Sequence, residues 1–140
     1  MKSVVDTNVL VALWDQDDTL NSAAISAFEH AQALGGLVVP GAVYAELLAL
    51  PGRSEEFLDQ FFSDTGIYVD WKFEEKIWRS AGRAFQAYTR RRSRQPVSGP
   101  RRILADFLIG AYAVCRGYQL LTLDDRLYRA AFPELTLIRI

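Results

Sequence analysis

The stretch Ser3-Val4-Val5-Asp6-Thr7-Asn8, near the start of this 140-residue chain, places an acidic residue at the end of a short apolar run. A short apolar run that leads into the helix-like pattern of residues 9–14 is typical of a buried strand followed by a helix. An ionised carboxylate taken out of water costs several kcal/mol unless a cation or hydrogen-bond donors meet it. We therefore predict that Asp6 lies at the C-terminal end of a strand and that something nearby compensates its charge.

The rest of the chain repeats this alternation of strand and helix patterns. Further strands are predicted at residues 37–39, 67–69, 119–123 and 135–140. Helices are predicted at residues 21–34, with Asn21 as the N-cap, at 41–50, from 54 onward, and at 73–88, 101–115 and 125–131. Residues 90–100, with two prolines and a glycine, are predicted to form a loop. Strands that alternate with helices indicate crossover connections, so we predict an α/β fold with a mostly parallel sheet covered on both faces.

Three further acids lie in or beside apolar segments: Glu46, Asp106 and Asp124. In open parallel sheets, ligands bind outside the C-terminal ends of the strands, where Asp6 and Asp124 should both project. Glu46 falls on the apolar stripe of the helix after the second strand, so it should face the body of the domain. Asp106 lies in the first turns of its helix, where Gly110 is expected to leave space around the carboxylate. These placements predict that the four acids converge.

Four convergent carboxylates would offer only oxygen ligands, which suit Mg²⁺ or Mn²⁺. The chain has one histidine and one cysteine, so a zinc site is disfavoured. For each acid alone an ordinary role stays open, because Asp6 and Asp124 could cap helices and Glu46 could pair with a buried arginine. The four together favour a shared metal pocket.

Charge is distributed unevenly along the chain, although the net charge is only −1. Residues 76–105 contain Lys76, eight arginines and no acid, which gives this segment +9 and leaves −10 for the remainder. Such a segment indicates a polyanionic partner, while a solvated helix face remains the alternative. No stretch reaches transmembrane length, and the single cysteine, Cys115, fits a reducing cytoplasm.

The ordered acidic motifs resemble those of the PIN-domain nucleases, and most closely the toxin subunits of VapBC-type toxin–antitoxin pairs. The resemblance covers essentially the whole chain, so residues 1–140 are interpreted as a single PIN-like nuclease domain. It is carried by four motifs: Asp6-Thr7-Asn8, Ala45-Glu46-Leu47, Asp106-Phe107-Leu108-Ile109-Gly110-Ala111 and Leu121-Thr122-Leu123-Asp124.

This resemblance implies a three-layer α/β/α sandwich, with about five strands in its sheet, and a Mg²⁺- or Mn²⁺-dependent endoribonuclease. The catalytic residues that it implies are Asp6, Glu46, Asp106 and Asp124, and the metal ligands among them are Asp6, Asp106 and Asp124. Asp125 remains a rival for the fourth place. Asn8 and Thr122 are predicted to hold carboxylates or water by hydrogen bonds. Arg101 and Arg102 are predicted to contact RNA phosphates, with residues 90–94 on the flank of the same groove.

The resemblance also implies partners: an RNA substrate such as transfer RNA, a small cognate antitoxin and a second copy of the chain, but no membrane. Residues 47–50 and 57–62 are candidate apolar contact surfaces for the dimer. The competing hypothesis is a non-catalytic PIN-like module that binds RNA or protein. A DNA substrate, the number of metal ions and the identity of the cleaved RNA stay open at this point.

Overall fold

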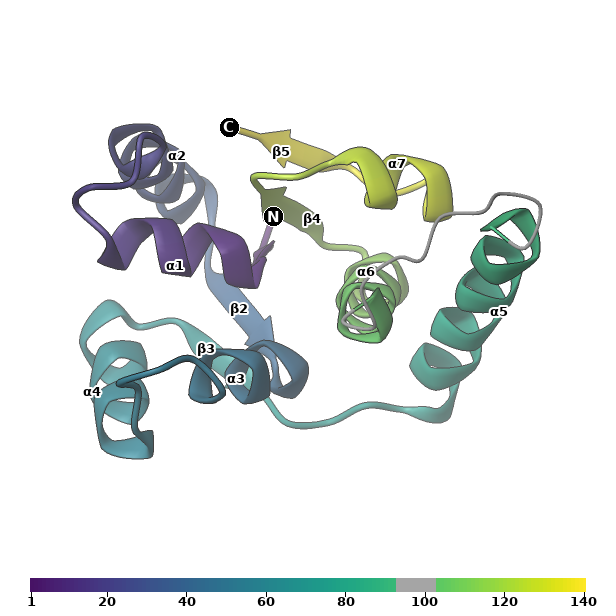
Figure 1. Ribbon diagram of the computed structural model, residues 1–140, viewed down its shortest axis with the longest axis horizontal. Helices are drawn as coiled ribbons and strands as arrows, with labels where there is room; N and C mark the ends of the chain where they lie inside the picture. The colour runs from purple at the N-terminus through teal and green to yellow at the C-terminus, as the bar shows by residue number, and fades with distance from the viewer. Residues whose placement is uncertain (93–102) are drawn as a thin grey trace.

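The structure is a computed structural model that describes residues 1–92 and 103–140. Its centre is a five-stranded sheet in the order β3-β2-β1-β4-β5, in which every neighbouring pair is parallel (Figure 1). The strands are β1 (Ser3–Val5), β2 (Leu37–Pro40), β3 (Tyr68–Asp70), β4 (Gln119–Thr122) and β5 (Leu137–Arg139). The predicted parallel sheet of about five strands is confirmed.

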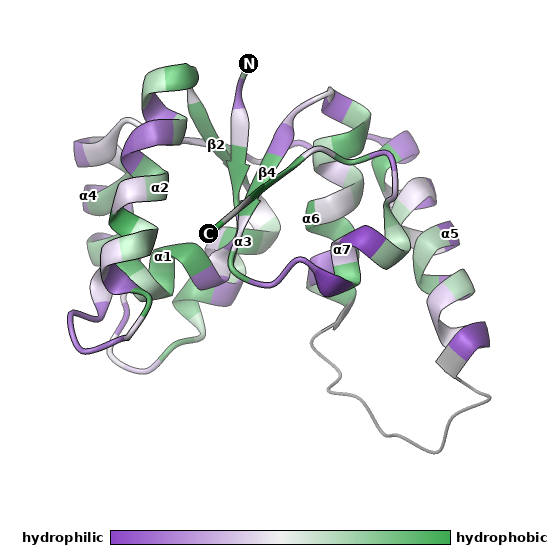
Figure 2. Cartoon of the chain, turned by 90° about the horizontal axis from the view of Figure 1, so that it is seen from above, coloured by the Kyte–Doolittle hydropathy of each residue, from purple (hydrophilic) through white to green (hydrophobic). Residues whose placement is uncertain are grey.

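Helices cover both faces of this sheet and complete the predicted three layers. Helices α1, α2 and α4 lie on one side and α5, α6 and α7 on the other, while α3 contacts both α1 and α6 (Figure 2). The bounds are α1 (Thr7–Trp14), α2 (Asn21–Leu34), α3 (Gly41–Leu48), α4 (Glu55–Thr65), α5 (Glu75–Arg92), α6 (Ile103–Arg116) and α7 (Arg126–Ala131). None of the helices within the described ranges is long and apolar enough to cross a membrane.

The strand order creates a switch point between β1 and β4. From β1 the chain moves outward to β2 and β3, then returns to β4 and continues outward in the other direction to β5. The connections that leave the C-terminal ends of β1 and β4 therefore diverge and open a crevice between them. Asp6 follows β1 and Asp124 follows β4, so both acids stand at this crevice.

Two local predictions were wrong. Leu20, not Asn21, is the N-cap of α2, and the amide of Asn21 instead donates a hydrogen bond to the carbonyl of Ala12 at 2.7 Å. Asn21 thus ties the end of α1 to the start of α2. Residues 90–92 were assigned to a loop but belong to α5, and residues 93–100 of that predicted loop lie outside the described residues.

Gly110 serves helix packing instead of leaving room around Asp106. A Cβ atom at Gly110 would lie 2.4 Å from Cε2 of Phe132, the residue that ends α7. Real Cβ atoms do not approach other atoms so closely, so α6 can meet the end of α7 only because residue 110 is glycine. This contact sets how closely the helix that carries Asp106 approaches α7.

The predicted dimer surfaces are buried only in part. Leu47 and Leu58 are fully buried and Phe62 is 5% exposed, so the inner faces of residues 47–50 and 57–62 belong to the core. Phe57 is the more accessible member, and the guanidinium of Arg53 lies 4.7 Å from the centre of its ring.

Candidate active site

Asp6 lies in a nearly closed cradle of three hydrogen-bond donors. The backbone N–H of Thr7 donates to Oδ1 at 2.8 Å, while the hydroxyls of Thr122 and Tyr128 donate to Oδ2 at 2.8 and 2.9 Å. The carboxylate caps α1, yet the residue is only 4% exposed. Parallel pairing of Val5 with Leu121 brings Thr122 beside Asp6. Asp6 therefore caps α1 and also belongs to the acidic site.

Asp106 faces the same cradle from the first turn of α6. Its Oδ1 lies 3.5 Å from the hydroxyl oxygen of Tyr128, so this single hydroxyl stands between Asp106 and Asp6. Tyr128 is 2% exposed on α7. Three elements that are far apart in sequence meet here.

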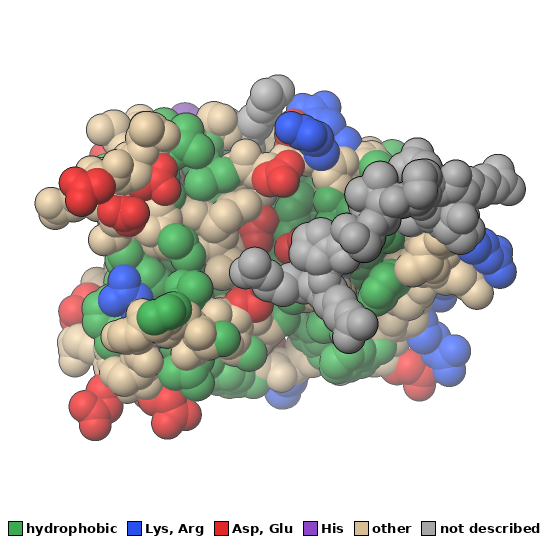
Figure 3. Space-filling view, viewed as in Figure 1, with side chains coloured by type: hydrophobic (Ala, Val, Ile, Leu, Met, Phe, Trp, Pro, Cys, Tyr) green, Lys and Arg blue, Asp and Glu red, His purple; other side chains and the backbone are tan. Residues whose placement is uncertain are grey.

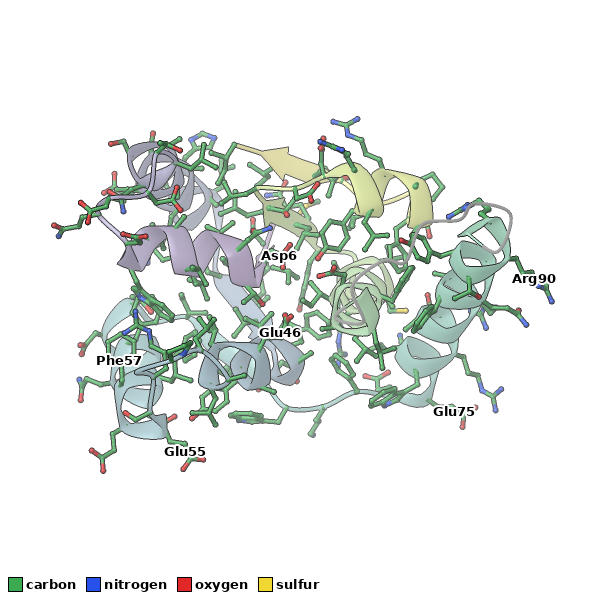
Figure 4. The ribbon with its side chains drawn as sticks, viewed as in Figure 1. Asp6, Glu46, Glu55, Phe57, Glu75 and Arg90 are labelled. Carbon is green, nitrogen blue, oxygen red and sulfur yellow. The ribbon has the colours of Figure 1, made fainter. Side chains whose placement is uncertain are left out.

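Glu46 joins the group through Thr7. The Thr7 hydroxyl donates to Oε1 of Glu46 at 2.6 Å, and the half-buried Glu46 side chain comes from α3. Figure 4 shows Asp6 and Glu46 close together where α1, α3 and α6 approach one another. Thr7 thus contacts both acids, Asp6 through its backbone and Glu46 through its side chain.

Burial and the neighbouring negative charges raise the pKa values of Asp6 and Asp106. Burial raises the pKa of Asp6 to about 6, with a smaller contribution from the charge of Glu46, although its hydrogen bonds work in the opposite direction. Burial also raises the pKa of Asp106 to about 7, and the nearby charges of Asp6, Glu46 and Asp124 add to this rise. Burial likewise raises the pKa of Tyr128 well above its ordinary value, so its hydroxyl keeps its proton.

The structure distinguishes between Asp124 and Asp125. Asp124 is exposed at the mouth of the cradle, where its charge raises the pKa of Asp106 and its Oδ1 accepts from the N–H of Arg126 at 3.3 Å. Asp125 instead forms an ion pair with Arg129, one turn further along α7. Asp124 is therefore the better candidate for the fourth acid.

Replacing each of these neighbours with asparagine separates their roles. For the metal-dependent RNA cleavage that the sequence resemblance implies, we expect Asp124→Asn to lower the rate by about 10- to 100-fold, because it removes charge at the carboxylate cluster. Asp125→Asn should change that rate less than about twofold and cost about 1 kcal/mol of stability, because its ion pair with Arg129 is partly exposed. Initial cleavage rates and thermal melts of the two variants test this; the reverse order of rates would make Asp125 the fourth acid.

The other residues that the sequence singled out differ in where the structure places them. Thr122 donates to Asp6, and Oδ1 of Asn8 accepts from the backbone N–H of Leu123 at 3.2 Å. Asn8 therefore fixes the loop that carries Asp124. Arg101 and Arg102 lie outside the described residues. Arg90, predicted to flank the groove, points away from Asp6 at the far side of α5 (Figure 4).

Sequence reasoning missed Tyr128 altogether and gave Thr7 no role. The motifs that it used consist of acids and their immediate neighbours, whereas Tyr128 stands four residues beyond Asp124 on an otherwise ordinary short helix. One signal was available: a buried tyrosine hydroxyl needs a hydrogen-bond partner, and a predicted carboxylate cluster lay close by in the sequence.

The oxygen atoms that meet at this site are of the kind that bind a hard divalent cation. Within residues 1–92 and 103–140, no three histidine, cysteine or acidic side chains form a group spaced as metal ligands. Hydroxyl groups stand between the acids instead, Tyr128 between Asp6 and Asp106 and Thr7 beside Glu46. All the donors are oxygens, and the raised pKa values show charge that the protein's own groups leave partly uncompensated.

An apolar groove runs away from the acids between α3 and α6. Its first part, of about 580 Å³, has Thr7 and Glu46 at one end and otherwise small or apolar walls, formed by Ala42, Ala45, Ala49, Leu50, Leu104, Ala105 and Leu108. It shares Ala42, Ala45 and Leu108 with a second hollow of about 310 Å³, which is bounded by Trp71, Phe73 and Trp78. Figure 3 shows acidic side chains near the middle of this face with hydrophobic side chains around them.

Comparisons with known proteins agree with this architecture. The family model of the PIN domain matches residues 3–133. Among solved structures, VapBC2 from Rickettsia felis, bound to a DNA fragment from its promoter, aligns over 100% of this chain and 99% of that chain with 19% identity and a TM-score of 0.70. VapBC-1 from nontypeable Haemophilus influenzae aligns over 99% and 98% (20%, TM-score 0.65), and FitAcB from Neisseria gonorrhoeae over 97% and 96% (18%, 0.64). No curated protein matches the sequence.

Proposed function

Because this chain belongs to the PIN-domain family, we propose that it is a divalent-metal-dependent nuclease that hydrolyses phosphodiester bonds in RNA. One observation carries the proposal. Asp6 is buried at the sheet's switch point, and the hydroxyl of Tyr128 lies between its carboxylate and that of Asp106. Burying two neighbouring carboxylates, one after β1 and one on α6, costs more free energy than a purely structural site requires. Their raised pKa values support a site built to receive a cation.

In this proposal Asp6, Asp106 and Asp124 hold Mg²⁺ or Mn²⁺. When bound there, such an ion would supply a lower pKa for a water molecule and would stabilise charge on the attacked phosphate. Glu46 has Oε1 held by Thr7, which leaves Oε2 to orient the water that attacks phosphorus. Thr122 and Tyr128 keep the buried carboxylate of Asp6 in one orientation.

RNA contacts are assigned to Arg101 and Arg102, the two residues that directly precede α6 in the chain. Charge-assisted contacts to phosphates position a nucleic acid without reading its sequence. If both arginines were replaced by alanine and neither the RNA affinity nor its salt dependence changed, this assignment would be wrong.

The function is tested by incubating the purified, partner-free chain with total cellular RNA in Mg²⁺, Mn²⁺ or EDTA. We expect discrete cuts that require the metal ion, and mapping the new ends identifies the target, for which transfer RNA is our proposal. A parallel incubation with single- and double-stranded DNA tests the choice of substrate. Folded protein that cuts nothing in either metal would favour a non-catalytic binding module.

We further propose that the chain is the toxin of a toxin–antitoxin pair and that its partner lies in the groove between α3 and α6. The structural neighbours are toxin–antitoxin complexes. The groove has apolar walls and ends at Thr7 and Glu46, so it suits a protein segment with small apolar side chains and a basic residue at the acidic end. Such a segment would block the carboxylates and inhibit cleavage.

Ala45→Arg tests the position of the partner, because Ala45 is exposed on the wall shared by both parts of the groove. A buried, unpaired arginine should weaken binding of the protein encoded next to this chain by about 100-fold. Isothermal titration measures the affinity. Ser63→Arg, at an exposed position on α4, is the control and should bind normally; equal affinities for the two variants would place the partner elsewhere.

A homodimer and a cytoplasmic location complete the proposal. The accessible side chains of residues 47–50 and 57–62, Phe57 among them, are the candidates for the dimer contact, and light scattering at micromolar concentration that gave a monomer would exclude the dimer. Fractionation of cells that express the tagged chain checks the location.

A further inference from the structure

We propose that Tyr128 is a positioning residue whose hydroxyl bridges Asp6 and Asp106 and thereby fixes how the two carboxylates present their oxygens to a divalent ion. This inference rests on the proposed metal-dependent function and adds a residue outside the four acids. Its basis is the location of one buried hydroxyl, 2.9 Å from Oδ2 of Asp6 and 3.5 Å from Oδ1 of Asp106.

The hydrogen bonds of Asp6 determine which of its oxygens remains available. A carboxylate oxygen accepts two hydrogen bonds in the plane of the group. The hydroxyls of Thr122 and Tyr128 both donate to Oδ2, whereas Oδ1 receives, among the described residues, only the backbone N–H of Thr7. Oδ1 therefore keeps an open acceptor site, and Tyr128 helps to reserve that oxygen for the ion.

The tyrosine itself is held rigidly. Its side chain is 2% exposed, and its backbone carbonyl accepts the N–H of Phe132 at 2.8 Å. Phe132 in turn fills the space above Gly110 on α6. Because α6 also carries Asp106, the close approach of the two helices sets the distance between the Tyr128 hydroxyl and that carboxylate.

Thr122 and Tyr128 thus do different things for Asp6. Thr122 extends from β4, the strand paired with β1, so it fixes Asp6 relative to the sheet. Tyr128 extends from α7 and faces both carboxylates, so it fixes Asp6 relative to α6. Removing the Tyr128 hydroxyl should leave the sheet unchanged but loosen the alignment of the two acids.

The test is Mn²⁺ binding by Tyr128→Phe, measured by isothermal titration on the metal-free full chain at pH 8 without RNA. Phenylalanine retains the buried ring and removes only the hydroxyl. We expect the affinity for Mn²⁺ to fall by about 10- to 100-fold, the usual effect of losing a group that orients a metal ligand. With RNA, kcat should fall while KM for RNA stays within about twofold.

Tyr112→Phe is the matched control. Tyr112 is also fully buried and also donates to a carboxylate, Oδ2 of Asp70 at 2.8 Å, but it belongs to a different hydrogen-bond group. This variant should melt at a lower temperature and bind Mn²⁺ as the wild type does. In an Asp106→Asn background, where the bridge has lost one carboxylate, Tyr128→Phe should have a smaller effect on Mn²⁺ affinity than in the wild type.

The outcomes separate this inference from the function on which it rests. A wild-type chain that binds Mn²⁺ and cuts RNA, with unchanged Mn²⁺ affinity in Tyr128→Phe, overturns the role of Tyr128 alone. Equal losses of Mn²⁺ affinity in Tyr128→Phe and Tyr112→Phe overturn it too, because they indicate a general effect of destabilisation. A wild-type chain that neither binds Mn²⁺ nor cuts RNA overturns both proposals.

Discussion

Asp6→Asn is expected to reduce metal-dependent RNA cleavage by about 1,000-fold or more. The substitution removes the charge of the most buried acid in the site, and an amide is a poor ligand for Mg²⁺ or Mn²⁺ in its place. Metal-ion catalysis contributes several kcal/mol to stabilising the transition state, and a loss of about 4 kcal/mol corresponds to roughly a thousandfold in rate. Single-turnover cleavage of the mapped RNA measures the effect.

Asp59→Asn is the matched control for this measurement. Asp59 also accepts a tyrosine hydroxyl, that of Tyr44 at 2.8 Å, but it lies on α4 outside the cradle. Its cleavage rate should stay within about twofold of the wild type. Equal cleavage by Asp6→Asn and the wild type, both folded by circular dichroism, would assign the activity to another site or to a contaminating enzyme.

The metal-free protein should lose stability as the pH rises from about 4 to 7.5, and Mn²⁺ should restore it. The folded-state pKa values of Asp6 and Asp106, about 6 and about 7, exceed the ordinary value of 3.8. Between 3.8 and these values the folded protein binds more protons than the unfolded chain, so the free energy of unfolding falls as the pH increases. Above about pH 7.5 both carboxylates are ionised and this loss is complete.

Thermal melts at several pH values, with EDTA or with Mn²⁺, measure both effects. At pH 8 and an ion concentration about 100 times the dissociation constant, Mn²⁺ should stabilise the protein by about 2.7 kcal/mol. For a domain of this size that corresponds to a rise in Tm of roughly 8 °C. The rise should shrink towards pH 5.5, because the ligands must lose their protons to bind the ion. A pH-independent rise in Tm would mean that Mn²⁺ binds away from Asp6 and Asp106.

The sequence was sufficient to predict the sheet, its layers and the convergence of acids, because these follow from local patterns. The apolar run before Asp6 and the one before Thr122 each predict a strand, and parallel strands bring their C-terminal ends to one edge. Glu46 was placed by its position on the apolar stripe of α3. None of these predictions needed the details of packing between helices.

The residues that sequence reasoning misjudged depend on such packing. Gly110 carries no sign that an aromatic ring, Phe132, will occupy the space beside it. Tyr128 becomes part of the site only because α7 folds back against α6, which the spacing of apolar residues does not encode.

The order of the strands also governs when the site comes into being during synthesis on the ribosome. β1 emerges first, but its neighbour β4 is made more than a hundred residues later, and Tyr128 follows β4. Until β4 pairs with β1, Thr122 cannot reach Asp6, and until α7 folds the bridge to Asp106 is missing. Long-range pairing of this kind also slows folding. A nascent chain therefore carries Asp6 through the synthesis of more than a hundred further residues without an assembled site, and the site is completed only after α7 has left the ribosome.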